Sequence, residues 1–174
     1  MERTQERTQG LRDFLKVCKA FIPDPTVVCS FSEATEEGVI TTKYGQQRYV
    51  PGYFIVTTGT AQSAVAPQKF AVTYTRSSMH TCFKSAVQKG ILIRELTDSV
   101  VKLLNSLSVD GTKIVKDENG DWSVKTLEST GGVKNQSLKE RYVLFFDVEF
   151  KNGQLGIGNI YPCSLESFNQ KYIH

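Results

Sequence analysis

The residues best suited to nucleophilic or metal chemistry lie together in RSSMHTCFKSAVQKG, residues 76–90. This stretch holds Cys82 and His80, which is one of only two histidines in the chain. A cysteine or serine nucleophile needs a base within hydrogen-bond reach and a third group that orients the base. We predict that the stretch is a helix, on which residues two apart point in different directions. His80 and Cys82 would then not face each other, and no catalytic residues are expected.

The helix prediction rests on the spacing of apolar residues between two capping residues. Ser77 or Ser78 suits the N-cap, and Gly90 suits the C-cap. Cys82 is expected to face the core, with His80 pointing away from it. The apolar residues that recur at helical intervals are Met79, Cys82, Phe83, Ala86 and Val87.

No metal and no cofactor is expected. Zinc takes four nitrogen, sulfur or oxygen ligands at short spacings, and the chain has no C-x-x-C pair. Most of its cysteines lie in or beside apolar runs, where a free thiol behaves as a small apolar side chain. We therefore expect free structural thiols at Cys18, Cys29, Cys82 and Cys163.

Glycines near the C-terminus superficially resemble a phosphate-binding loop. They are Gly153, Gly156 and Gly158, and they precede no predicted helix and no Gly-Lys-Ser/Thr sequence. We expect this segment to be a strand, in which the glycines mark a bulge or a close approach by another backbone.

Asp147 and Glu149 are the candidates for acid–base chemistry. Strand alternation sends both carboxylates to one face, about 7 Å apart, which overlaps the separation in paired-carboxylate hydrolases. A solvated acidic edge that prevents sheets from aggregating explains the same pair without chemistry. We favour that interpretation and expect no enzyme activity.

Basic and aromatic residues alternate through residues 43–76 and are the candidates for a nucleic-acid surface. Cations and rings on neighbouring strands provide phosphate contacts and base stacking. The formal net charge of +3 is mild, and no RNP-like motif is present. Binding of RNA or single-stranded nucleic acid, as by a viral accessory protein, is therefore the alternative hypothesis. Its site would be Lys43, Tyr44, Arg48, Tyr49, Lys69, Tyr74 and Arg76.

These candidates depend on an N-terminal helix and a first group of strands. Apolar residues at helical spacing predict a helix over residues 11–22, and residues 1–9 are expected to be a flexible tail. The small, polar segment 58–68 is the first loop that we expect to touch a ligand. Four strands are predicted within residues 26–32, 38–44, 49–59 and 69–75, the third being either an edge strand or broken at Pro51-Gly52.

A second helical pattern covers residues 93–107. Either the helix begins near Ile93, or residues 91–95 form a short strand and the helix begins at Thr97 or Asp98. The apolar stripe packs on the sheet or forms a dimer seam. The interface candidates are Ile93, Leu96, Val100, Leu103 and Leu107.

The last third returns to strands. Asn119-Gly120 and Asn152-Gly153 favour tight turns, so a hairpin is predicted around each. Residues 129–137 are expected to be a flexible connector. In the strand that contains Asp147, one face is expected to be core and carries Leu144, Phe146, Val148 and Phe150.

We predict one α+β domain over residues 1–174: a curved, mainly antiparallel sheet with the N-terminal helix and one or two central helices on one face. No signal-peptide pattern or membrane-length apolar run is present, so we expect a cytoplasmic or nuclear protein that is not secreted. The expected function is a non-enzymatic protein-interaction domain, either a homo-oligomer such as a homodimer or a subunit of a larger assembly. A third hypothesis is a small-ligand cup lined by Phe54, Phe70, Phe83 and Trp122.

Overall fold

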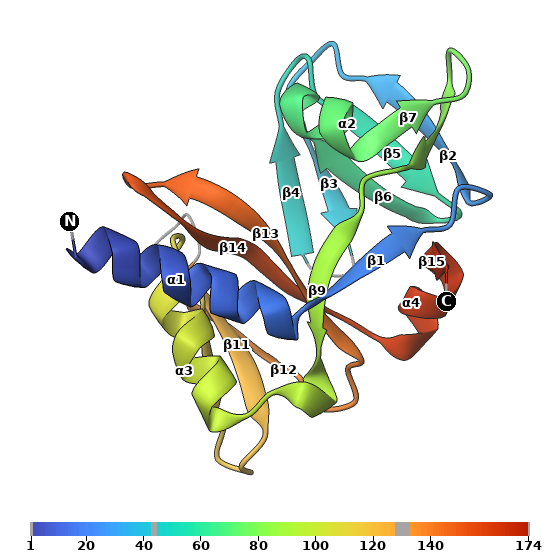
Figure 1. Ribbon diagram of the computed structural model, residues 1–174. Coiled ribbons are helices and arrows are strands. Elements are labelled where there is room, and N and C mark those ends of the chain that lie inside the picture. Colours follow the sequence, from blue (N-terminus) through green and yellow to red (C-terminus); the bar gives the residue numbers. More distant parts are fainter. Residues whose placement is uncertain (1, 43–44, 128–132, 174) are drawn as a thin grey trace. The chain divides into compact units, whose positions relative to one another are not determined.

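The computed structural model describes residues 2–42, 45–127 and 133–173 (Figure 1). Over these residues the chain is an α+β protein with four α-helices and 15 strands, which confirms the predicted fold class. The strands are divided among several antiparallel sheets. In the described part of the chain, no helix is long and apolar enough to cross a membrane.

The chain divides into two compact units. Unit 1 consists of Met1–Phe21 and Gln88–Asn169, and unit 2 of Ile22–Val87 and Gln170–His174. The sequence predicted one domain because no composition change marks either boundary. Each unit builds its own cluster of buried side chains.

Unit 1 combines two antiparallel sheets with helices. Strands β14, β13, β9 and the first residues of β1 pair in that order, and β10, β11 and β12 form the second sheet. Its elements are α1 (Glu2–Val17), β1 (Lys19–Pro23), β9 (Gln88–Leu92), the short 3-10 helix η1 (Ile93–Glu95), α3 (Asp98–Leu107), β10 (Lys113–Lys116), β11 (Trp122–Leu127), β12 (Val133–Ser137), β13 (Val143–Lys151), β14 (Gln154–Cys163) and α4 (Leu165–Lys171).

Helices α1 and α3 lie side by side in unit 1 (Figure 1). The ring of Phe14 in α1 lies 5.3 Å from that of Phe146 in β13, within the buried cluster. Helix α1 begins at Glu2, whereas the sequence predicted a flexible tail over residues 1–9. The guanidinium of Arg7 accounts for the difference, because it donates three hydrogen bonds that tie the first turns to unit 1. Its acceptors are the carbonyl oxygens of Ser106, Leu107 and Leu155, at 2.8 to 3.0 Å.

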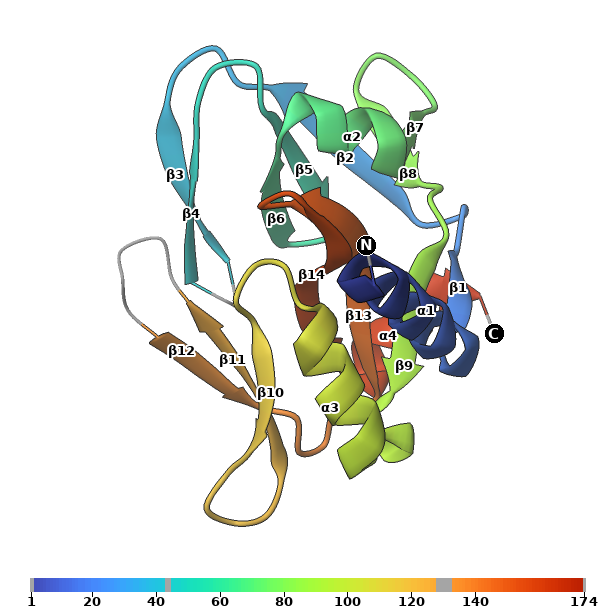
Figure 2. The same ribbon diagram turned by 60° about the vertical axis from the view of Figure 1, so that its left-hand side comes forward.

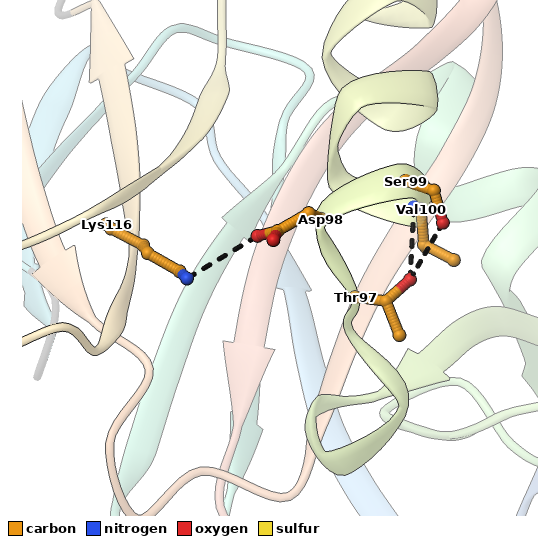
Figure 3. Close-up of polar contacts among 5 residues, drawn as sticks. All are labelled: Thr97, Asp98, Ser99, Val100 and Lys116. Atoms are coloured by element: carbon orange, nitrogen blue, oxygen red, sulfur yellow. Dashed lines mark hydrogen bonds and ion pairs between the residues drawn. The ribbon is translucent and has the colours of Figure 1, made fainter.

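Helix α3 begins at the later of the two predicted positions. The hydroxyl of Thr97 caps it by accepting a hydrogen bond from the backbone N–H of Val100 at 3.3 Å (Figure 3). Asp98 in the first turn pairs with Lys116 of β10 at 3.5 Å. The cap satisfies an orphan backbone donor and the carboxylate suits the positive end of the helix, which together fix where the helix starts.

Unit 2 is built on a five-stranded antiparallel sheet in the order β6-β5-β2-β8-β7. A separate hairpin, β3–β4, stands beside β6 (Figure 2). The short strand β15 pairs with the last residues of β1. The elements are β2 (Val28–Glu33), β3 (Gly38–Thr42), β4 (Gly45–Tyr49), β5 (Phe54–Thr58), β6 (Ala61–Val65), α2 (Pro67–Thr73), β7 (Tyr74–Arg76), β8 (Thr81–Lys84) and β15 (Tyr172–Ile173).

The helix predicted over residues 77–90 is wrong. The segment turns at residues 77–80, forms β8 and continues into β9. The hydroxyl of Ser78, predicted as a helix cap, instead accepts from the backbone N–H groups of His80 and Thr81 and stabilises the turn. Cys82 faces the core as predicted, because a strand buries alternate residues. Gly90 lies inside β9, where a Cβ would come 2.9 Å from the ring of Phe145.

Three other strand and loop predictions are wrong in part. Most of the strand predicted over residues 69–75 belongs to α2, which begins with Pro67, a residue that suits the first helical turn. The predicted loop 58–68 contains β6. Of the predicted connector 129–137, residues 133–137 form β12 and residues 129–132 lie outside the described residues.

The remaining strand predictions are confirmed. Strand β3 lies within its predicted segment, and β2 extends one residue beyond its own, to Glu33. Strand β5 is not an edge strand and begins at Phe54, after the predicted break at Pro51-Gly52. Both predicted hairpins form. Asn152-Gly153 is a tight two-residue turn with positive φ at both residues (54° and 76°), whereas the turn that contains Asn119-Gly120 spans residues 117–121 and has positive φ at Gly120 (81°).

Candidate ligand-binding site

One face of the five-stranded sheet of unit 2 is only partly filled. Alternation along β2 and β5 sends Phe31 and Phe54 to this face, where Phe70 of α2 packs on them. The rings of Phe54 and Phe70 stack with centroids 4.2 Å apart, and Phe31 lies 5.2 Å from Phe70. The aromatic cluster covers this part of the face and leaves the part around Cys29 and Val56 to line a cavity.

The cavity is half-open and has a volume of about 560 Å³. Its floor is formed by Val27, Cys29, Val56 and Tyr74, which contribute apolar surface, a thiol and a ring. Its walls carry hydroxyl and amide groups from β5, β6 and the β3–β4 hairpin. All of its lining residues belong to unit 2.

A side chain of the hairpin holds one wall in place. The backbone N–H of Ala64 in β6 donates to the side-chain oxygen of Gln47 in β4 at 3.0 Å. Because backbone groups alternate along a strand, the N–H of Gln62 points to the same side, away from β5. The outer edge of β6 therefore faces the hairpin and the cavity between them.

The floor of the cavity is neutral. Burial is the main cause that raises the pKa of Tyr74 to about 12 and the pKa of Cys82, which is on the same face of the sheet as the floor, to about 11. Cys29 lies directly across from Cys82 on the neighbouring strand, and its sulfur is 3.1 Å from the hydroxyl oxygen of Thr58. The Tyr74 phenol and the Cys82 thiol therefore stay protonated near neutral pH.

Charged residues line another part of the cavity: Lys84 of β8, Lys171 and Asp24. The ammonium of Lys84 donates to the phenol oxygen of Tyr172 at 3.0 Å. The carboxylate of Asp24 accepts from the hydroxyl and the backbone N–H of Thr26, and these hydrogen bonds lower its pKa. The charged lining residues are thus two lysines and one aspartate.

The sequence predicted that the residues of the nucleic-acid hypothesis lie on neighbouring strands of one sheet. The described ones instead lie on a separate hairpin, a helix and one strand. Lys43 and Tyr44 lie outside the described residues. Arg48 and Tyr49 belong to the separate hairpin, and Lys69 is exposed on α2. On β7, the ring of Tyr74 stacks on Phe70, and the guanidinium of Arg76 lies over the rings of the aromatic cluster, 5.2 Å from the centroid of Phe31. RNA binding by this set stays a prediction.

The predicted interface stripe lies against the core of unit 1. Leu96 and Leu107 are buried, and Ile93, Val100 and Leu103 are half-buried against the same cluster. Packing within unit 1 is therefore sufficient to explain the helical spacing of these residues. A dimer seam along the stripe stays a prediction.

Asp147 and Glu149 lie in β13 of unit 1. The carboxylate of Asp147 accepts from the side-chain amide of Asn159 at 2.9 Å and lies 3.4 Å from that of Gln88. These contacts give Asp147 a structural role. On the other face of β13, Leu144 and Phe146 are buried as predicted, whereas Val148 and Phe150 are exposed.

The third sequence hypothesis named a cup but chose the wrong lining. Phe54 and Phe70 belong to the aromatic cluster, and Trp122 packs against the core of unit 1. The loop suspected of touching a ligand does contribute Thr58, Thr60 and β6 residues to the cavity. Sequence reasoning missed Cys29, Val56 and Lys84. Lys84 would have been found if residues 81–84 had been recognised as a strand, because it then shares a face with Cys82.

Within the described residues, no three His, Cys, Asp or Glu side chains gather in a way that could hold a metal ion. Comparison of the chain with protein-family models, with curated proteins and with solved structures finds no match.

Proposed function

We propose that this chain is a non-enzymatic binding domain that holds a ligand in the cavity of unit 2. The observation that supports this function is the cavity itself, whose volume of about 560 Å³ lies within the range of small-molecule sites. Its apolar floor would remove ligand surface from water. The hydroxyl and amide groups of its walls would orient the ligand through hydrogen bonds.

Binding is proposed rather than catalysis because of the chemistry of the lining. A cysteine nucleophile requires a base, and no described residue that lines the cavity is a histidine. Cys29 instead contacts the hydroxyl of Thr58, and the neighbouring Cys82 thiol has a raised pKa.

A bulky side chain that fills the cavity as a plug, introduced by substitution to phenylalanine, tests this proposal. Ser63 lies on the cavity side of β6, whereas Ala64, which is not among the residues that line the cavity, sends its side chain to the other face. The probe is phenylnaphthylamine, an uncharged aromatic compound whose fluorescence rises in apolar sites. We expect S63F to weaken saturable probe binding by about tenfold or more, and A64F to leave it nearly unchanged.

Thermal unfolding of both variants shows whether each is folded, and A61F offers a second plug on the same face as Ser63. No saturable binding to the wild type, or equal binding by the wild type and both folded plug variants, would contradict the proposal.

Self-association is a second candidate, favoured by one observation in unit 1. The side chains of Phe150 and Leu155 stand directly opposite each other near the turn of the β13–β14 hairpin and are 73% and 48% exposed. Val148, on the same face, is 38% exposed. Exposed apolar side chains that cluster, unlike single ones, are typical of interaction surfaces. A second copy of the chain is the occupant that we propose, and light scattering tests it.

A further inference from the structure

We infer that Cys29 and Cys82 form a reversible disulfide under oxidising conditions, and that this bond weakens ligand binding in the unit 2 cavity. Both cysteines are free thiols in the structure. The formation of the bond depends only on the geometry of two neighbouring strands. Its effect on binding rests on the proposed function, because it concerns the ligand of the same cavity.

The pairing of two strands brings the two cysteines together. Cys29 of β2 and Cys82 of β8 stand directly opposite each other in the antiparallel register. Two positions further along this pair of strands, the backbone N–H of Phe31 donates to the carbonyl oxygen of His80 at 2.9 Å. Because hydrogen-bonded pairs alternate along an antiparallel ladder, the two cysteines also form such a pair, with Cα atoms about 5.5 Å apart. This is a common Cα separation for a disulfide.

The two thiols interact in the reduced chain. Opposite residues of an antiparallel pair send their side chains to the same face of the sheet. Burial raises the pKa of the Cys82 thiol to about 11, and the Cys29 thiol adds to this rise through its charge and through a hydrogen bond. The side chains are therefore close enough for one sulfur to reach the other.

The two cysteines differ in their access to a reagent. Cys29 lines the half-open cavity, whereas Cys82 is fully buried. A small disulfide such as hydroxyethyl disulfide, the oxidised form of mercaptoethanol, would therefore react with Cys29 first. The Cys29 thiolate attacks one of its sulfur atoms, and one mercaptoethanol leaves. The Cys82 thiolate then attacks the Cys29 sulfur and displaces the second mercaptoethanol, so that two cysteine thiols are oxidised and one disulfide is reduced.

The geometry of the strands makes the bond easy to reduce again. Opposite Cβ atoms of an antiparallel pair lie about 4.5 to 5.5 Å apart, and hydrogen-bonded pairs have the wider spacing. The Cβ atoms of a disulfide lie about 3.5 to 4.5 Å apart, so the strands must draw together when the bond forms. Strained disulfides have higher reduction potentials than relaxed ones and are the labile ones. We therefore expect the bond to open in a reducing buffer.

The bond would change the floor of the cavity. The sulfur of Cys29 lies 3.1 Å from the hydroxyl oxygen of Thr58 in β5, and β5 and β8 flank β2 on opposite sides. A bond to Cys82 turns this sulfur toward β8, so its contact with the hydroxyl is lost. Thr58 also lines the cavity, and an apolar ligand would then cover a hydroxyl that has lost a partner. Since such a loss costs about 1 kcal/mol, we expect oxidation to weaken phenylnaphthylamine binding about fivefold.

Peptide mapping by mass spectrometry tests the bond. The full chain is incubated in buffers with different ratios of mercaptoethanol to hydroxyethyl disulfide, and free thiols are then blocked with iodoacetamide. We expect the peptides of Cys29 and Cys82 to be linked in the oxidising buffers and separate in the reducing ones. In C82A, Cys29 should instead retain one bound mercaptoethanol. C18S, which removes a cysteine of unit 1, should form the bond as the wild type does.

The outcomes separate the inference from the proposed function. The inference is wrong if the folded wild type gives no linked peptide at any ratio, or gives one only after urea is added. If the bond forms but oxidised and reduced wild type bind the probe equally, while S63F weakens binding, the cavity binds ligands and the claimed effect of the bond is overturned. If the bond forms but the reduced wild type binds no probe, the proposed function fails and the disulfide stands.

Discussion

Gly156 shows how a single residue position constrains this fold. In unit 1, β14 passes so close to the end of α3 that a Cβ on Gly156 would overlap the carbonyl oxygen of Leu107 and press on Val109. Gly10 in α1 is different, because a Cβ there would lie 3.4 Å from Leu103, an ordinary contact. The same change, glycine to alanine, should therefore have opposite effects at the two positions.

We expect G156A to lower the free energy of unfolding by about 2 kcal/mol, because a backbone carbonyl cannot move aside as a side-chain tip can. G10A should raise it by about 0.5 kcal/mol, because alanine is the better helix former. Urea denaturation measures both. A G156A protein as stable as the wild type would show that β14 and α3 are not so close.

Residue-level properties were the part of the structure that the sequence predicted best. The glycine spacing around Gly156 indicated a close backbone approach, and the structure shows one. The burial of Cys82 was predicted correctly from a wrong element, because apolar residues are buried in helices and strands alike.

At the scale of elements, the segment 77–90 shows why local pattern was insufficient. Its apolar residues fit helical spacing, but Met79 and Val87 are exposed. The strand forms because Thr81, Cys82 and Phe83 pair with β2, more than 50 residues earlier in the chain. Pairing between distant segments leaves no local signal. The hairpins at Asn119-Gly120 and Asn152-Gly153 join strands that are adjacent in the sequence, and their turn residues predicted them.

The β13–β14 hairpin carries the prediction that belongs to this scale. We expect the wild type to self-associate as its concentration rises, and F150S to stay monomeric, because the change removes the most exposed ring of the patch. V72S is the matched control, since Val72 on α2 of unit 2 is 72% exposed. Light scattering coupled to size exclusion measures the mass. A wild type that is monomeric throughout, or an F150S protein that associates equally, contradicts this candidate.

The β14 edge of the same hairpin is protected. The carbonyl oxygen of Leu155 accepts from Arg7, and the carbonyl of Ile157 accepts from the backbone N–H of Val109. Natural sheets cover exposed edges in this way and so avoid pairing with other chains. The self-association that we propose would therefore not extend the sheet from β14, and it would bury the side chains of the patch.

At the scale of the whole molecule, the chain builds two buried clusters in separate compact units. The path leaves unit 1 after Phe21 and returns at Gln88. The sequence predicted one α+β domain, and it predicted the class correctly because strand and helix content are local properties. The cavity could not be predicted as a site, because Cys29, Val56 and Lys84 come from three strands whose order depends on the fold.

The central claim is that the unit 2 cavity binds a ligand, and amide correlation NMR of the full chain tests it most directly. Titration with anilinonaphthalenesulfonate should shift the amide signals of residues around the cavity in a saturable way, including Cys29, Gln62 and Lys84. The amides of Ile91 and Leu104, in the core of unit 1, should stay in place. Signals that shift around Phe150 instead, or no saturable shift at all, would contradict the account.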